Sequence, residues 1–206
     1  MKRFAAAAVT AVMALGAPMS ASAEQYGGPG FSGDAYMAEN NGTPKKMGTV
    51  HVDSAGFRMN MNSGGQNVAS ILHWDSDTVI TLMLDQKMYM EIPPEQSGWS
   101  QYENKACSGY KNAKKIGSES VAGRPAVKWR CTGPVNTPTD ESPTDATVWF
   151  DNELGFEIRM VEDDGNVFEV RNVAIGRQDA SMFKIPNGYT KFDMNAMMQQ
   201  MMQQKQ

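Results

Sequence analysis

The sequence predicts an all-β protein with minor helix, built as one antiparallel sheet that curls or closes. Two features of residues 31–173 lead to this prediction. Short runs alternate apolar with polar residues, and turn residues such as Asp and Gly separate the runs at nearly regular spacing. No convincing long helix, fixed repeat or domain boundary interrupts the series. We therefore expect about ten strands in a single domain over residues 24–192.

The first 23 residues are typical of a cleaved signal peptide. Lys2 and Arg3 precede an apolar stretch over residues 4–15, which is too short to span a bilayer, and residues 21–23 (Ala-Ser-Ala) supply a cleavage site. No later segment is apolar for long enough to cross a membrane. We expect a mature chain that begins at Glu24 and is released, soluble, into the periplasm.

The strands are expected to pair through short turns. In residues 57–61, for example, Phe57, Met59 and Met61 face one way and the two polar residues between them face the other. Asp-Gly at residues 164–165 is a strong hairpin signal. The expected strands cover residues 47–52, 57–61, 66–74, 78–84, 88–92, 115–121, 126–131, 146–150, 156–161 and 166–173.

Two segments break the alternation. Residues 95–112 suit a loop or a short helix, and residues 132–144 are polar and proline-rich, which is typical of an exposed loop. Cys107 and Cys131, one in the first segment and one just before the second, favour a structural disulfide in an exported protein. A redox-active or metal-bound thiol pair is the alternative, which the wide spacing and the lack of a nearby histidine disfavour.

Charge and motif content exclude several classes of function. Nineteen Lys and Arg against 23 Asp and Glu give a formal net charge of −4, and loss of the signal peptide makes the charge more negative. Nucleic acid is therefore excluded as a partner. The sequence has no nucleophile elbow, phosphate-binding loop, zinc-protease motif or plausible Cys–His pair. We expect no enzyme, no cofactor and no metal site, a linker at residues 27–30, and solvated or hydrogen-bonded His51 and His73.

Seventeen methionines form the strongest bias in the composition. Nine lie in the β domain, where core packing explains most of them, although a methionine-rich lining also suits varied apolar ligands. Residues 193–206 carry a helical stripe that Asp193 can cap, expected as a lid on the sheet. Contact with a partner or membrane, or coordination of cuprous copper, is the alternative. The stripe consists of Met194, Met197, Met198, Met201 and Met202.

Three segments carry a resemblance to a known family. The run over residues 71–92, the turn over residues 151–155 and the closing Phe-x-x-Pro-x-Gly-Tyr element over residues 183–189 resemble those of small exported bacterial proteins. These proteins are related to the periplasmic outer-membrane lipoprotein carrier and its LolA-like fold. The resemblance implies a strongly curved half-barrel whose apolar concave face is partly covered by helical segments. In the carrier, that concavity holds acyl chains.

We accordingly expect a non-catalytic periplasmic protein that binds a lipid, an acyl chain, a lipidated protein or another hydrophobic ligand. A copper-handling protein that uses the methionine-rich tail, or an envelope interaction protein whose sheet supports loops such as residues 132–144, is the alternative. The apolar side chains expected to line the concave face are Met37, Phe57, Met59, Met61, Leu72, Trp74, Met83, Met88, Met90, Trp129, Phe150, Phe156 and Ile158.

Overall fold

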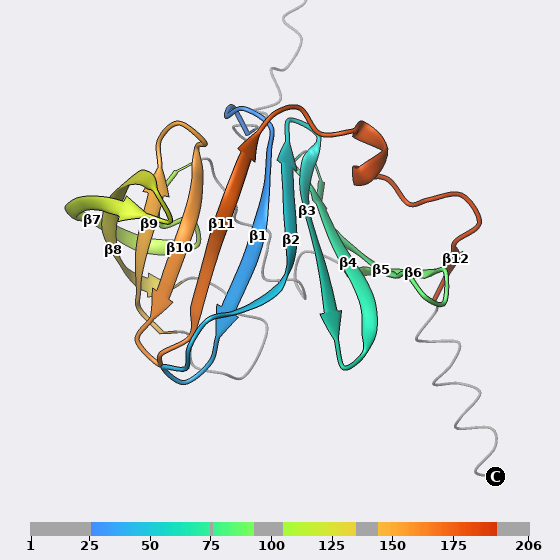
Figure 1. The fold of residues 1–206 in the computed structure, drawn as a ribbon, viewed down its shortest axis with the longest axis horizontal. Helices are drawn as coiled ribbons and strands as arrows, with labels where there is room; N and C mark the ends of the chain where they lie inside the picture. The colour runs from blue at the N-terminus through green and yellow to red at the C-terminus, as the bar shows by residue number, and fades with distance from the viewer. Residues whose placement is uncertain (1–25, 75, 93–104, 135–143, 193–206) are drawn as a thin grey trace, which may run out of the picture.

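The computed structural model describes residues 26–74, 76–92, 105–134 and 144–192. These residues form one open, curved sheet in the order β12-β6-β5-β4-β3-β2-β1-β11-β10-β9-β8-β7 (Figure 1). Neighbouring strands are antiparallel, except that β12 runs parallel to β6. The predicted fold class is confirmed. The predicted signal peptide and the methionine-rich tail lie outside the described residues.

The elements follow the alternation of the sequence closely. The strands are β1 (Phe31–Ala38), β2 (Lys45–Asp53), β3 (Gly56–Ser63), β4 (Gln66–His73), β5 (Ser76–Met83), β6 (Met88–Ile92), β7 (Tyr110–Val121), β8 (Arg124–Pro134), β9 (Ala146–Asp151), β10 (Phe156–Glu162), β11 (Val167–Ile175) and β12 (Thr190–Lys191). One 3-10 turn, η1 (Ala180–Phe183), lies between β11 and β12.

Twelve strands are described where about ten were expected, and the two additional strands are β1 and β12. Strand β1 is followed by β2, but its other neighbour is β11, from the far end of the chain. Strand β12 has two residues, which pair with Met88 and Tyr89 of β6. Strand β7 also begins at Tyr110, inside the segment expected to be a loop or helix.

Aromatic contacts show which face of the sheet is concave. The rings of Phe57 on β3 and Phe156 on β10 lie 6.0 Å apart, and those of Phe31 on β1 and Phe156 lie 5.4 Å apart. Strands β3 and β10 are four positions apart in the sheet, which is roughly 19 Å along a flat sheet. The rings can meet because the sheet curves toward the face that carries them. We call this the concave face.

One end of the concave face is closed by packed side chains. Tyr26 stacks on Trp74 with ring centroids 5.5 Å apart, and its hydroxyl donates to the carbonyl of Leu154 at 2.6 Å. These residues join Phe31, Phe57 and Phe156 in the largest core cluster. Tyr26, directly before the linker predicted at residues 27–30, therefore packs against the sheet. We call this end the aromatic end.

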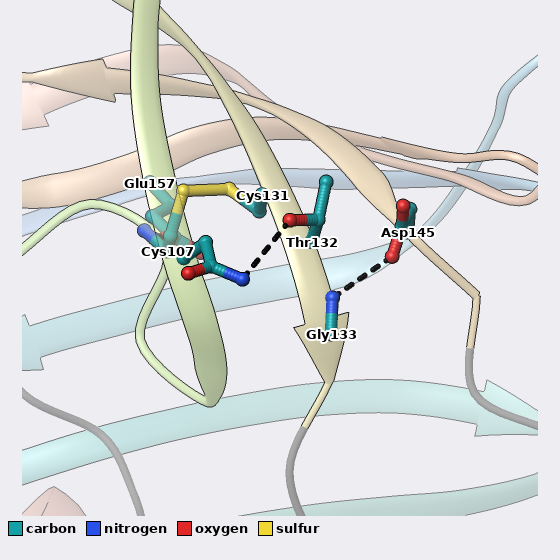
Figure 2. Close-up of a disulfide and its surroundings, with 7 residues drawn as sticks. Cys107, Cys131, Thr132, Gly133, Asp145 and Glu157 are labelled. Atoms are coloured by element: carbon teal, nitrogen blue, oxygen red, sulfur yellow. Dashed lines mark hydrogen bonds between the residues drawn. A yellow bond between two sulfur atoms is a disulfide. The ribbon is translucent and has the colours of Figure 1, made fainter.

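The predicted disulfide between Cys107 and Cys131 is confirmed (Figure 2). It ties the residues before β7 to β8, and both cysteines are buried with Ala146 and Val148 of β9. In β8, Val127, Trp129 and Cys131 pair with Phe150, Val148 and Ala146, respectively. Met160 and Phe168 continue the row through Val148 toward β1. This register places the disulfide on the concave face of β8–β10.

The convex face of β3–β6 is covered by residues 179–189. Phe183 of η1 is 1% exposed and packs with Ile71 and Leu82, supported by Met182, Ile185 and Tyr189. Figure 1 shows this segment passing from β11 along β3 and β4 to reach β12. The closing element predicted at residues 183–189 is therefore a cover on the outside of the sheet.

Candidate ligand-binding face

Strand register arranges the concave face of β3–β6 in three rows. Each row takes one side chain from each of the four strands, because alternate residues of a strand share a face. We call the row farthest from the aromatic end the methionine row. From that row inward, the rows are Met61, Val68, Met83 and Met88; then Met59, Ser70, Thr81 and Met90; then Phe57, Leu72, Val79 and Ile92.

Burial decreases along these rows from the aromatic end outward. Phe57 and Leu72 are each 4% exposed, and Val79 is 6% exposed. All four side chains of the methionine row are partly exposed. In the described part of the chain, the single helix, η1, contacts β3 and β4 and packs against the opposite face. Every described side chain of the methionine row is therefore accessible in part, whereas the row at the aromatic end is mostly buried.

No charged side chain lies in the three rows. Ten of the twelve side chains are apolar, and Ser70 and Thr81 are the polar members. The intervening residues, such as Arg58 and Glu91, alternate onto the convex face. Next to the methionine row, the same line of pairing continues through the small residues Gly48 and Ala35. The surface is thus uncharged and rich in flexible thioethers, a lining that adapts to apolar ligands of varied shape.

The disulfide-bonded segment packs on the concave face of β8–β10. Glu157 of β10 accepts a hydrogen bond from the backbone N–H of Cys107 at 2.8 Å, and the N–H of Ser108 also donates to it. Burial raises the pKa of Glu157 to about 7, against the opposing effect of these two hydrogen bonds. Burial likewise raises the pKa of Tyr110 to about 12. The carboxyl of Glu157 thus anchors the cover to the sheet.

The structure separates the thirteen predicted contact residues into several groups. Met83, Met88 and Met90 are partly exposed on the concave face of β5 and β6. Trp129 packs beside the disulfide, and its buried Nε1 has no partner among the described residues. Phe150 is 9% exposed, whereas Met37 is 42% exposed on β1. The remaining seven lie in or against the largest core cluster: Phe57, Met59, Met61, Leu72, Trp74, Phe156 and Ile158.

Several residues of this face were missed by sequence reasoning. Val68 and Val79 belong to the three rows, and the alternation within their strands contained the signal that could have found them. Tyr26 was missed for a different reason. A single aromatic residue before a glycine-rich stretch has no periodicity, so its place in the core depends on tertiary contacts.

The two histidines are hydrogen-bonded on the convex side, as expected. His51 Nδ1 lies 2.9 Å from Gln178 Oε1, and His73 Nε2 lies 2.5 Å from the carbonyl oxygen of Phe183. Arg58 donates from Nη1 to the carbonyl of Met182 at 2.7 Å, and burial lowers the pKa of its guanidinium. These polar groups hold the cover of residues 179–189. Across the described ranges, no group of three or more His, Cys, Asp or Glu side chains is placed to hold a metal ion.

Comparison with known proteins gives a fold but no family. No family model matches the chain, and no curated protein matches it. An uncharacterized conserved protein from Thermus thermophilus aligns with a TM-score of 0.54 at 8% identity, over 83% of this chain and 94% of that one. PNGF-II aligns with a TM-score of 0.51 at 11% identity, over 83% of this chain and 32% of PNGF-II. Identities this low indicate a shared fold alone.

The predicted resemblance to lipoprotein-sorting proteins is present among the matched structures. A putative outer membrane lipoprotein-sorting protein domain from Vibrio parahaemolyticus aligns at 9% identity and a TM-score of 0.37, over 75% of this chain and 89% of that one. With a TM-score below 0.5, no residue of the face is assigned from this match. None of the described helices is long and apolar enough to cross a membrane.

Proposed function

We propose that this chain is a non-catalytic binding protein that holds a lipid, an acyl chain or another apolar segment, such as that of a lipidated protein, on the concave face of β3–β6. The observation that carries the proposal is the methionine row. Its side chains are partly exposed and uncharged, while the opposite face of the same strands is sealed by residues 179–189. Covering such a surface contributes roughly 25 cal/mol for each Å² of apolar area removed from water.

The disulfide supports the proposed location in the periplasm. A bond between Cys107 and Cys131 persists in oxidising compartments and is rare in the cytosol. Sequencing of the N-terminus of the protein purified from cells should find Glu24 as the first residue. A chain that retains residues 1–23 would contradict cleavage at Ala23.

We further propose that the tail over residues 193–206 acts as a lid on the methionine row. Phe192 donates its backbone N–H to the carbonyl of Tyr89 at 2.7 Å, so the tail begins beside β6, at the edge of this row. Fourteen helical residues span about 21 Å. The distance from β6 to β3 is three strand spacings, or about 14 Å in a flat sheet. The proposed helix is therefore long enough to place its methionine stripe across the row.

Binding of an apolar probe tests the face directly. We expect the purified, delipidated protein to bind 1-anilinonaphthalene-8-sulfonate and to release it when palmitate is added. Met83→Lys and Val68→Asp should each weaken palmitate binding at least tenfold, because they put a charge in the methionine row. Met47→Lys is the matched control. Met47 is 37% exposed and lies on β2 outside the three rows, at the irregularity in the pairing of β1 with β2, so this variant should change the affinity less than twofold.

Three outcomes would overturn the proposal for the face: no saturable binding by the wild type, equal affinities for all three variants, or a loss in Met47→Lys as large as in Met83→Lys. Circular dichroism of each variant verifies that the strands are retained. Deletion of residues 193–206 tests the lid separately. It should raise dye fluorescence and speed palmitate entry, and unchanged values would refute the lid while leaving the binding face intact.

A further inference from the structure

We propose that Met83, Met88 and Met90 form a binding site for a soft monovalent metal ion, Cu⁺ or its redox-inert analogue Ag⁺. The site uses side chains of the concave face but does not depend on binding of an apolar ligand. It also differs from the sequence-based copper alternative, which used methionines of the tail.

The three thioethers converge through strand register. Met83 and Met88 are directly opposite each other across β5 and β6, where Cβ atoms lie about 5 Å apart. Met88 and Met90 are two residues apart on the same face of β6, about 7 Å. Met90 is diagonal to Met83, at about 7–8 Å, which is within reach of long side chains. The three flexible methionine side chains can therefore bring their sulfur atoms around one ion.

Accessibility selects this group over the other methionines of the face. All three side chains are partly exposed, so an ion can enter and the thioethers can change rotamer. In the second Met-x-Met pair of the sheet, on β3, Met61 is also partly exposed, but Met59 is buried. Met59 is 7% exposed inside the core, and its neighbours across the strands are Val50 and Ser70, which offer no third sulfur.

The surroundings determine which ions the site can take. The neighbouring concave side chains of β4–β6 are Val68, Thr81 and Ile92, and Thr190 of β12 is paired with Met88, so no carboxylate or imidazole is offered in these rows. Thioethers favour Cu⁺, whereas Zn²⁺ requires imidazole, thiolate or carboxylate, and Mg²⁺ and Ca²⁺ require oxygen ligands. A monovalent ion also carries a smaller desolvation cost into an apolar surface than a divalent ion does. The site should therefore bind the soft ions Cu⁺ and Ag⁺ in preference to Zn²⁺, Mg²⁺ and Ca²⁺.

Titration of the full mature protein with Ag⁺ alone, and with Cu⁺ under anaerobic conditions against a chromogenic chelator, tests the proposal. One equivalent should shift the ε-methyl resonances of Met83, Met88 and Met90 in a spectrum of methyl-labelled methionine. Zn²⁺ should shift none of them. Met83→Leu, Met88→Leu and Met90→Leu should each weaken Ag⁺ binding at least tenfold, and the triple variant should abolish saturable binding. Met61→Leu, the matched control from the same row, should change the affinity less than threefold.

The leucine variants separate this site from the proposed apolar function. Leucine keeps the volume and apolar character of methionine but removes the sulfur. Loss of Ag⁺ binding in the triple variant would therefore report the loss of sulfur and not of apolar volume, and Ag⁺ binding by the wild type is measured without any apolar ligand. Unchanged Ag⁺ affinity in the triple variant, shifts confined to Met194, Met197 and the other tail methionines, or the absence of any saturable shift in the wild type would each overturn the site. The methyl shifts of the wild type decide the matter even if the triple variant does not fold.

Discussion

Glu157→Gln should stabilise this protein at pH 8 but not at pH 4.5. Glu157 lies beneath the disulfide-bonded segment, accepts backbone N–H groups from Cys107 and Ser108, and has a pKa of about 7 because it is buried (Figure 2). Its reference pKa is 4.5. Below pH 4.5 the carboxyl holds its proton in both the folded and the unfolded chain. Between pH 4.5 and 7 the folded chain retains a proton that the unfolded chain loses, so stability falls as the pH rises.

The size of this effect follows from the two pKa values. At roughly 1.4 kcal/mol for each pKa unit, the ionised carboxylate costs the folded state about 3 kcal/mol above pH 7. Glutamine removes that cost, and its amide oxygen can accept the same two N–H groups. The neutral amide oxygen is a weaker acceptor than the carboxylate, and this difference lowers the gain in stability by about 1 kcal/mol. The net gain in the free energy of unfolding at pH 8 should therefore be about 2 kcal/mol.

Urea unfolding of the oxidised protein at pH 4.5 and pH 8 measures this difference. Other carboxyl groups titrate equally in the wild type and the variant, so the change between the two pH values isolates Glu157. Glu39→Gln, at an exposed position, is the control and should alter stability by less than about 0.5 kcal/mol at either pH. If Glu157→Gln has the same effect at both pH values, or destabilises the protein at pH 8, the argument from burial is refuted.

Three further predictions concern stability. Cys107→Ser combined with Cys131→Ser opens a loop with a sequence separation of 24, and the free energy of unfolding in urea should fall by about 3.5 kcal/mol. As a control, adding reductant to the wild type should cause an equal loss. No loss of stability in the variant would contradict a stabilising bond. Arg124→Met leaves the carboxylate of Asp151, whose side chain is 1% exposed, without its cation, and should cost about 3 kcal/mol in the same assay. Glu153→Gln, at the 63% exposed partner of Arg124, should cost less than about 1 kcal/mol, and equal costs would contradict the role of burial. Phe183→Ala should lower the free energy of unfolding by about 3–5 kcal/mol and speed amide exchange in residues 179–191. Lys184→Ala, at an exposed position, should do neither. Unchanged exchange in Phe183→Ala would show that Phe183 does not hold the cover.

Local patterns in the sequence predicted most of the strands. Phe57, Met59 and Met61 share a face because successive side chains of a strand point to opposite sides, a property of the backbone alone. The disulfide was also predictable, since an exported chain with two cysteines has a single intramolecular pairing. Boundaries were less accurate. Strand β7 begins at Tyr110 because its pairing with Pro134 extends beyond the disulfide, and no local alternation marks that extension.

The candidate face could be predicted in part. Met83, Met88 and Met90 were identified from alternation, and the structure places them together on β5 and β6. Phe57, Phe156 and Ile158 were chosen by the same criterion, yet they are packed into the aromatic end. Alternation reports which face a side chain is on, but not how much of that face other parts of the chain cover. Whether a side chain is packed or accessible therefore depends on contacts distant in sequence.

The sequence by itself determined the class of the protein: an uncharged apolar face on an antiparallel sheet, a predicted export signal, and no recognisable catalytic motif. Strand order and curvature were decided by tertiary structure. The pairing of β1 with β11 brings strands from opposite ends of the β domain to the middle of the sheet, and curvature brings Phe57 within 6.0 Å of Phe156 across four strand positions. The physical reason is that alternation arises from the backbone of each strand, whereas order and curvature arise from burying apolar surface between distant segments. That burial closes the aromatic end and leaves the methionine row accessible.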